Sequence, residues 1–146
     1  MTWKQLLAEG RIEPHSTSRQ ELEALRSAVN RNLRDAAFGQ LSADNRFGLA
    51  YEAALLAAKM AVACAGYRVK GQGAHRTTFT ALKLALGDPV SKTATYLERC
   101  RRKRNELSYD AAGVVTDTEA AEMHAQAKAL QETVEHWIAK NRPHLS

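Results

Sequence analysis

The 146-residue chain is poor in the residues that interrupt helices, with three prolines and eight glycines. Aromatic residues make up only 6% of it, which disfavours a fold built from many β-strands. Hydrophobic residues still account for 45%, and many of these are alanine, the residue with the highest intrinsic helix propensity. A chain of this length can bury one core without disulfides or metal ions. The composition therefore predicts a single all-α domain of closely packed helices.

Cysteine is also scarce: Cys64 and Cys100 are far apart and form no C-x-x-C motif. We expect both to be reduced, partly buried thiols of a cytoplasmic protein. The first ten residues lack the apolar core of a signal peptide. The most apolar stretch, residues 49–67, contains Glu52 and Lys59 and is rich in alanine, so we do not expect it to span a membrane.

The motifs of several common chemistries are missing. The sequence has no H-E-x-x-H, no paired cysteines and no series of aspartates that would bind a metal ion. It also lacks a G-x-x-x-x-G-K-[ST] phosphate-binding loop and a serine in a nucleophile elbow. We therefore expect neither a metal nor another cofactor.

Hydrophobic periodicity predicts one compact bundle of about five helices over residues 1–146, with residues 1–16 as a short helical or irregular lead-in. Ser18 and Glu21 have capping-box spacing, and apolar residues then recur every three or four positions until Gly39. The second predicted helix, over about residues 44–67, is apolar on nearly all sides and should be the central one. A glycine loop over 66–73 follows it. The remaining predicted helices are a third from about 75 or 77 to 86, a fourth from Asp88-Pro89 to about 108, and a fifth after Thr116 and Glu119 that ends before Pro143.

Positive charge is concentrated in the fourth predicted helix. Lysine and arginine number 21 against 16 acidic residues, a net charge of +5. Five of these cations occupy six positions: Arg99, Arg101, Arg102, Lys103 and Arg104. Such a block favours an anionic partner, although a merely solvated helix face is the alternative.

One of these arginines falls where a core residue belongs. On a helical wheel, Leu97, Cys100 and Leu107 form an apolar arc, and Arg104 lies inside it. The residues that point away from this arc are Arg99, Arg102, Asn105 and Glu106. A buried guanidinium needs a carboxylate, a subunit interface or a bound anion, and its planar fork suits phosphate. An internal salt bridge, or a side chain that reaches out to water, would explain the same pattern.

The segment Arg104-Asn105-Glu-Leu-Ser-Tyr109-Asp110 resembles the signature of HEPN domains. The resemblance extends over about residues 18–140, including the alanine-rich second helix, the loop from Gly66 to Arg76 and the last helix with Trp137. It implies an up-and-down four-helix core and a homodimer. Many HEPN proteins are metal-independent endoribonucleases and toxins of toxin–antitoxin pairs. The implied partners are therefore RNA or a nucleotide, and a cognate antitoxin or nucleotidyltransferase.

The HEPN motif has an arginine, a polar residue, and a histidine five positions after the arginine. Arg104 and Asn105 match the first two positions, but Tyr109 occupies the histidine position. Histidine suits acid–base chemistry because its pKa lies near 6.5. Tyrosine, with a pKa of about 10, is ionised to roughly one part in a thousand at pH 7 and is a poor base. His75, in the glycine loop, is a candidate substitute for the missing imidazole, although an ordinary loop or capping histidine is the alternative.

Three hypotheses follow. The first is a non-catalytic module that binds RNA, a nucleotide or a partner; the second is a ribonuclease that uses Arg104 and Asn105 with Tyr109 or His75; the third is a structural dimerisation bundle. We favour the first because the anion-binding residues are present and the motif's proton-transfer residue is not.

In the favoured hypothesis each candidate residue has a distinct role. Arg101 and Arg104 hold the anion, while Asn105 and Tyr109 hydrogen-bond or stack. Asp110 orients an arginine or caps the turn, and His75 supports the site. The electrostatic surround consists of Arg99, Arg102 and Lys103.

Overall fold

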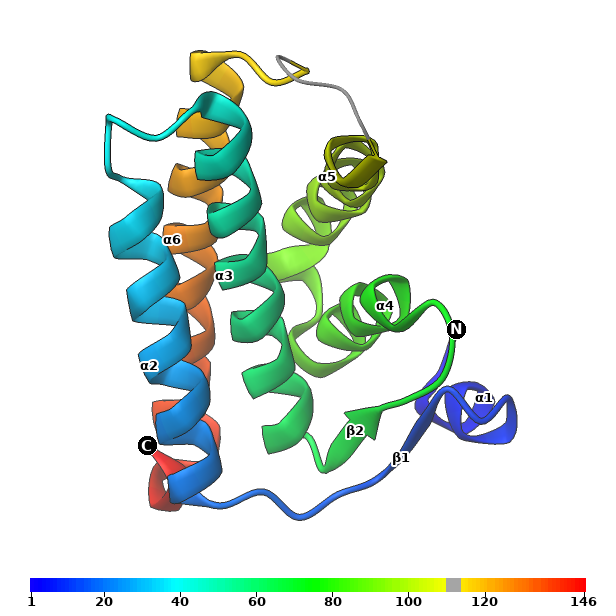
Figure 1. Ribbon diagram of the computed structural model, residues 1–146. Helices are drawn as coiled ribbons and strands as arrows, with labels where there is room; N and C mark the ends of the chain where they lie inside the picture. The colour runs from blue at the N-terminus through cyan, green and yellow to red at the C-terminus, as the bar shows by residue number, and fades with distance from the viewer. Residues whose placement is uncertain (110–113) are drawn as a thin grey trace.

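The computed structural model describes the backbone of residues 1–109 and 114–146 and the side chains of residues 1–105 and 114–146. The predicted all-α class is confirmed (Figure 1). The described residues form the five expected helices, one additional short helix and two single 3-10 turns. These elements are α1 (Trp3–Ala8), α2 (Arg19–Ala36), α3 (Ala43–Cys64), α4 (Ala74–Leu86), η1 (Asp88–Val90), α5 (Ser91–Tyr109), α6 (Asp117–Asn141) and η2 (Pro143–Leu145).

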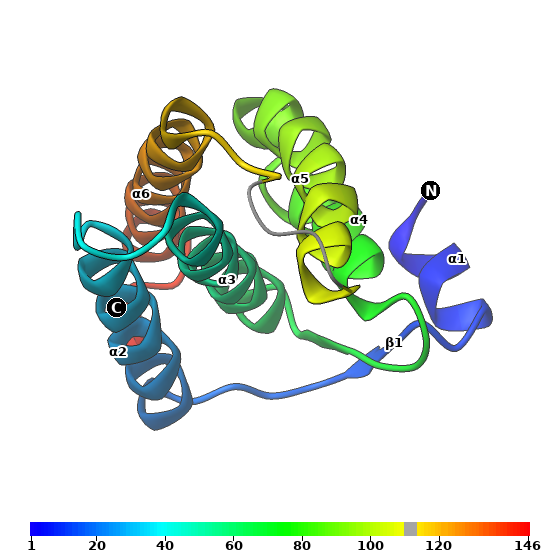
Figure 2. The ribbon, with the colours of Figure 1, turned by 45° about the horizontal axis from the view of Figure 1, so that its top comes forward.

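Helix α3 is the centre of the bundle. It packs chiefly against α6 and α2 on one side and against α4 and α5 on the other (Figures 1 and 2). Its length and apolar composition alone would suit a membrane span, but 72% of its apolar window is buried inside the protein. Alanines such as Ala50, Ala54 and Ala57 are fully buried, so neighbouring helices can approach α3 closely. The nearly all-round apolar pattern is thus explained by burial on both sides of the helix.

The predicted loop after the second helix contains a short strand that the sequence did not indicate. Residues Tyr67–Val69 form strand β2, which pairs antiparallel with strand β1, Ile12–Pro14, with Ile12 opposite Val69. Three-residue strands are too short to show the period-2 alternation by which a strand is recognised. The lead-in is consequently ordered, and α1 begins with a complete capping box between Thr2 and Gln5.

A small separate core lies beside the β1–β2 pair. Leu6 and Ile12 of the N-terminal segment are buried together with Val62 of α3 and Ala81 of α4. Trp3 stacks on Tyr67 with ring centroids 4.5 Å apart. The N-terminal segment is therefore attached to the bundle by apolar packing as well as by the strand pairing.

The helix starts agree with the capping signals, with two differences. Thr116 and Glu119 form the predicted capping box of α6. Ser18 accepts the amide of Glu21, but the Glu21 carboxylate accepts from His15 and Thr17 instead of completing the box. Asp88 and Pro89 form the 3-10 turn η1, and α5 itself begins at Ser91.

Candidate functional site

Helix α5 distributes its basic residues over different surroundings. Arg101 and Arg104 are half-buried, Lys103 is half-buried beside α6, and Arg99 and Arg102 are exposed. Leu97 and Cys100 on the same helix are buried, so the described part of the apolar arc predicted from the wheel faces the core, while the side chain of Leu107 lies outside the described residues. The Arg104 side chain therefore projects from the face of α5 that is turned to the core, and its Nε atom is shielded from solvent.

The inner surroundings contain a buried tyrosine–histidine pair. The Oη atom of Tyr51 on α3 lies 3.0 Å from Nδ1 of His75 on α4, and Tyr51 is fully buried. Phe79 of α4 contacts the Tyr51 ring edge-on, with centroids 6.0 Å apart. Arg101 and Arg104 lie close enough for their positive charges to act on both Tyr51 and His75. His75 therefore lies within range of the charges of the two inner arginines.

Burial sets the protonation of this pair. Desolvation raises the pKa of Tyr51 well above its usual value, although Arg101 and Arg104 oppose the shift. Desolvation also lowers the pKa of His75 below its usual value, a shift that the charge of Glu52 opposes. At pH 7 the pair consists of a protonated phenol and a neutral imidazole.

Arg101 is held by a carboxylate of its own helix. Its Nε and Nη2 atoms donate to Glu98 Oε1 over 3.0 and 2.7 Å, and this bond raises the pKa of Arg101. The second oxygen of Glu98, Oε2, is buried and accepts no hydrogen bond from the described residues. Glu98 therefore occupies the Nε and Nη2 donors of Arg101, and the predicted contact of Arg101 with an anion stays a prediction.

Lys103 also has an internal partner. Its Nζ atom lies 2.5 Å from Glu119 Oε2, and the pair joins α5 to the first turn of α6. Lys103 lowers the pKa of Glu119. Lys103 therefore links α5 to α6, and its predicted place in the electrostatic surround stays a prediction.

The remaining motif residues are only partly covered by the structure. Asn105 is exposed on α5, pointing away from the core as the helical wheel predicted. The side chain of Tyr109 and the whole of Asp110 lie outside the described residues. Their roles stay predictions from the sequence.

A second basic surface lies in the groove between α4 and α5. The groove has a volume of about 320 Å³, and its cations are Arg76 and Lys83 from α4 and Arg99 and Arg102 from α5. All four residues are exposed, and none forms an ion pair with another described residue. Glu98, which contributes the only carboxylate among the groove's lining residues, is already bonded to Arg101.

The lining of this α4–α5 groove combines an apolar base with small polar groups. Phe79 and Ala94 are buried residues of its lining, and Thr80 and Thr95 carry hydroxyls. The Arg99 guanidinium lies 5.7 Å from the centroid of the Tyr96 ring, a distance at which a cation and an aromatic face attract. The arrangement suits phosphate groups, which guanidinium and ammonium donors bind by charge-assisted hydrogen bonds.

Sequence reasoning missed three residues of these two sites. Arg76 and Lys83 are seven positions apart, two helical turns, and so share a face of α4 that could have been recognised beside the basic helix. Tyr51 lies in an alanine-rich run and was not among the predicted site residues. A buried tyrosine hydroxyl usually has a hydrogen-bond partner, so Tyr51 on the central helix could have indicated a polar partner inside the core.

The other titratable groups among the described residues do not form a further reactive cluster. Within those residues, no group of three or more His, Cys, Asp and Glu side chains could hold a metal ion. Burial raises the pKa of the Cys64 thiol to about 11, and Cys100 is likewise buried with a raised pKa. His124 bonds to the carbonyl of Leu33, 3.0 Å away, and so fixes α6 to α2.

Comparison of the chain with protein-family models, curated proteins and solved structures returns no match.

Proposed function

We propose that this chain is a HEPN-like helical module that binds single-stranded RNA through the α4–α5 groove, without strong catalytic activity of its own. The observation that carries the proposal is the set of four exposed cations around one groove: Arg76, Lys83, Arg99 and Arg102. Inner cations of the same basic block are occupied, since Arg101 bonds to Glu98 and Lys103 to Glu119.

Charge accounting favours a nucleic acid over a merely solvated helix face. An exposed basic face in a folded protein is commonly neutralised by neighbouring carboxylates on the next turn or helix. Among the described residues, the carboxylates of Glu98 and Glu119 pair with Arg101 and Lys103, and none pairs with the four cations of the groove. A phosphate backbone supplies regularly spaced negative charges to such a groove.

RNA binding of this kind would depend little on sequence. The groove offers two threonine hydroxyls and few aromatic faces for base stacking. Affinity would therefore come mainly from phosphate contacts, for which dissociation constants of about 1–100 µM at physiological salt are typical.

The test is fluorescence anisotropy with a labelled single-stranded RNA of about a dozen nucleotides. Replacing Arg99 and Arg102 by glutamine should weaken binding about tenfold or more, because two phosphate contacts are lost from an exposed surface. The matched control is Arg19→Gln with Arg31→Gln, which removes two exposed cations from α2 and should change the affinity less than twofold. Equal affinities of the two double variants would contradict the proposal.

The second candidate is a metal-independent endoribonuclease. The observation in its favour is the neutral imidazole of His75, which lies within the electrostatic reach of Arg101 and Arg104. A neutral imidazole can accept the proton of a 2′-hydroxyl, and a guanidinium can stabilise the pentacoordinate phosphate. For this transfer Nδ1 must carry the hydrogen and donate it to the Tyr51 oxygen, so that the lone pair of Nε2 accepts the proton.

Incubation of RNA with the purified protein in EDTA separates the two functions. The ribonuclease candidate predicts cleavage that disappears in Arg104→Ala and falls at least a hundredfold in His75→Gln, the usual scale of losing a general base. The binding module predicts no cleavage by any of these proteins while the RNA is still retained. Cleavage that persists in both variants would point to a contaminating nuclease and would support neither candidate.

A further inference from the structure

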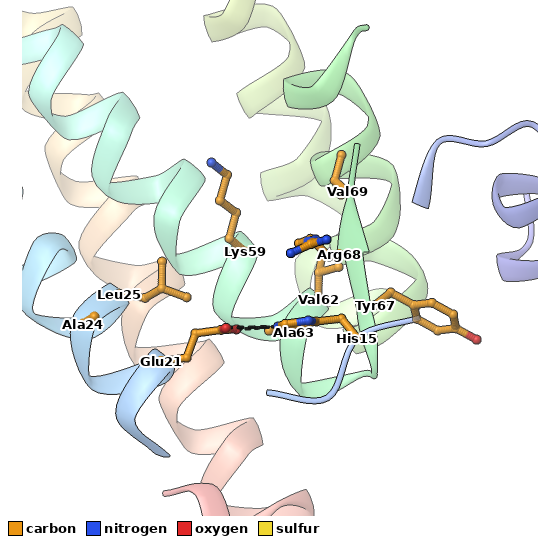
Figure 3. Close-up of a pocket in the computed structure, with 10 residues that line it drawn as sticks. All are labelled: His15, Glu21, Ala24, Leu25, Lys59, Val62, Ala63, Tyr67, Arg68 and Val69. Carbon is orange, nitrogen blue, oxygen red and sulfur yellow. Dashed lines mark hydrogen bonds and ion pairs between the residues drawn. The ribbon is translucent and has the colours of Figure 1, made fainter. Parts of the chain in front are cut away.

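A second hollow lies on another part of the molecule, between α2, the C-terminal half of α3 and β2 (Figure 3). It has a volume of about 410 Å³, within the range of sites for small molecules. None of its lining residues belongs to the α4–α5 groove. Any ligand bound here would therefore leave that groove open.

The walls of this α2–α3–β2 groove are mainly apolar. Leu25 of α2 faces Val62 and Ala63 of α3, and Val69 of β2 extends the apolar surface. Figure 3 shows the Tyr67 ring turned away from the groove, consistent with its stack on Trp3. The aromatic ring that lies nearest thus does not fill the space.

Two cations reach toward the groove from one side. Figure 3 shows the Lys59 ammonium and the Arg68 guanidinium above the apolar wall. Lys59 is exposed and has no ion-pair partner among the described residues. Arg68 shares the Glu13 carboxylate with Lys70, so these three groups together keep one positive charge.

The opposite end is closed by a polar pair. His15 Nε2 lies 2.8 and 3.0 Å from the two carboxylate oxygens of Glu21, which also accepts the Thr17 hydroxyl over 2.9 Å. The Glu21 carboxylate would repel a ligand that carries several negative charges. The groove therefore combines an apolar body, cations at one rim and an anion at the other end.

We propose that this groove binds a small amphipathic monocarboxylate, whose apolar chain or ring lies on Leu25 and Val62 and whose carboxylate pairs with Lys59 and Arg68. Arg68 with its neighbours keeps one positive charge, Lys59 adds a second and Glu21 carries one negative charge, so the groove, apart from His15, has a net charge of +1 that a single carboxylate would neutralise. The apolar part of such a ligand would be buried against the lining, a gain that an inorganic anion without an apolar part does not have. This ligand would be held independently of the RNA surface proposed above.

Octanoate is the probe, titrated into the isotopically labelled protein while amide chemical shifts are followed by NMR. The proposal predicts saturable shifts that cluster on α2, α3 and β2, with a dissociation constant on the order of a millimolar for so small a ligand. Acetate, which lacks the chain, and octylamine, which has the opposite charge, should not saturate these amides at the same concentrations. Equal binding of octylamine would overturn the role given to the cations.

Two substitutions with matched controls test the location. Ala24→Trp fills the groove from an exposed position of α2 and should abolish the saturable shifts, whereas Ser27→Trp, on the same helix outside the lining, should not. Lys59→Met keeps the aliphatic stem and should weaken octanoate about fivefold or more, whereas Lys128→Met on α6 should not. Binding that is unaffected by both Ala24→Trp and Lys59→Met would refute this site.

Discussion

The phenol oxygen of Tyr51 and Nδ1 of His75 lie 3.0 Å apart, and their hydrogen bond joins the central helix α3 to the start of α4. Each group thereby gives the other a partner in a region from which water is largely excluded. Burial keeps Tyr51 protonated and His75 neutral, so the pair is uncharged at pH 7; Arg101 and Arg104 oppose burial at Tyr51 and reinforce it at His75.

Loss of this bond should be measurable as a loss of stability. Tyr51→Phe removes the hydroxyl, so Nδ1 of the half-buried His75 imidazole loses its hydrogen bond to Tyr51. This loss should cost about 1–3 kcal/mol of unfolding free energy. The midpoint of urea unfolding reports this change. Tyr67→Phe is the control, since no hydrogen bond of its hydroxyl is present among the described residues, and an equal loss in that variant would contradict the assignment.

The stability of the protein should fall at acid pH in part through His75. Its pKa is lowered in the folded state, so the unfolded chain takes up the proton first as the pH drops through about 6.5. The resulting loss of stability is absent well above pH 6.5 and complete below the folded-state pKa. His75→Gln should therefore lose less unfolding free energy than the native protein between pH 7.5 and pH 5.

An NMR titration of the His75 ring checks the same claim directly. The ring resonances should titrate with a midpoint below 6.5, because burial disfavours the imidazolium. A midpoint above 6.5 would show that the neighbouring acidic residues outweigh burial, and the neutral-imidazole account would be wrong.

The close packing of α3 predicts a low tolerance for larger side chains. Ala57 is fully buried on this helix, which packs against α6 and α2. Ala57→Leu should cost about 1–3 kcal/mol of unfolding free energy because the core has no room for three added carbons. Ala129→Leu, at an exposed position of α6, should change stability by less than about 0.5 kcal/mol, and similar losses in both variants would contradict the packing described here.

The helices were predictable because their signals are local. Alanine content, three-and-four periodicity and the cap at Thr116 act within a few residues of one another, and they predicted the five long helices. The strand pair joins residues that are 55 positions apart, such as Glu13 and Arg68, through only three residues on each side. No local pattern carries that information.

The sequence predicted those features of the candidate site that depend on the position of a residue around a single helix. The wheel of α5 correctly separated the half-buried Arg104 from the exposed Arg102 and Asn105. It did not predict that Glu119 of another helix binds Lys103, nor that α4 adds Arg76 and Lys83 to the groove. These relationships depend on how helices pack, which periodicity within a single helix does not determine.

The salt dependence of RNA binding tests the central claim most directly. If Arg76, Lys83, Arg99 and Arg102 each contact a phosphate, the logarithm of the association constant should fall with the logarithm of salt concentration with a slope of about −3 on single-stranded RNA. Arg99→Gln with Arg102→Gln should reduce the slope to about −1.5, because two of the four contacts are removed. A slope near zero, or one that the double variant leaves unchanged, would contradict binding through the α4–α5 groove.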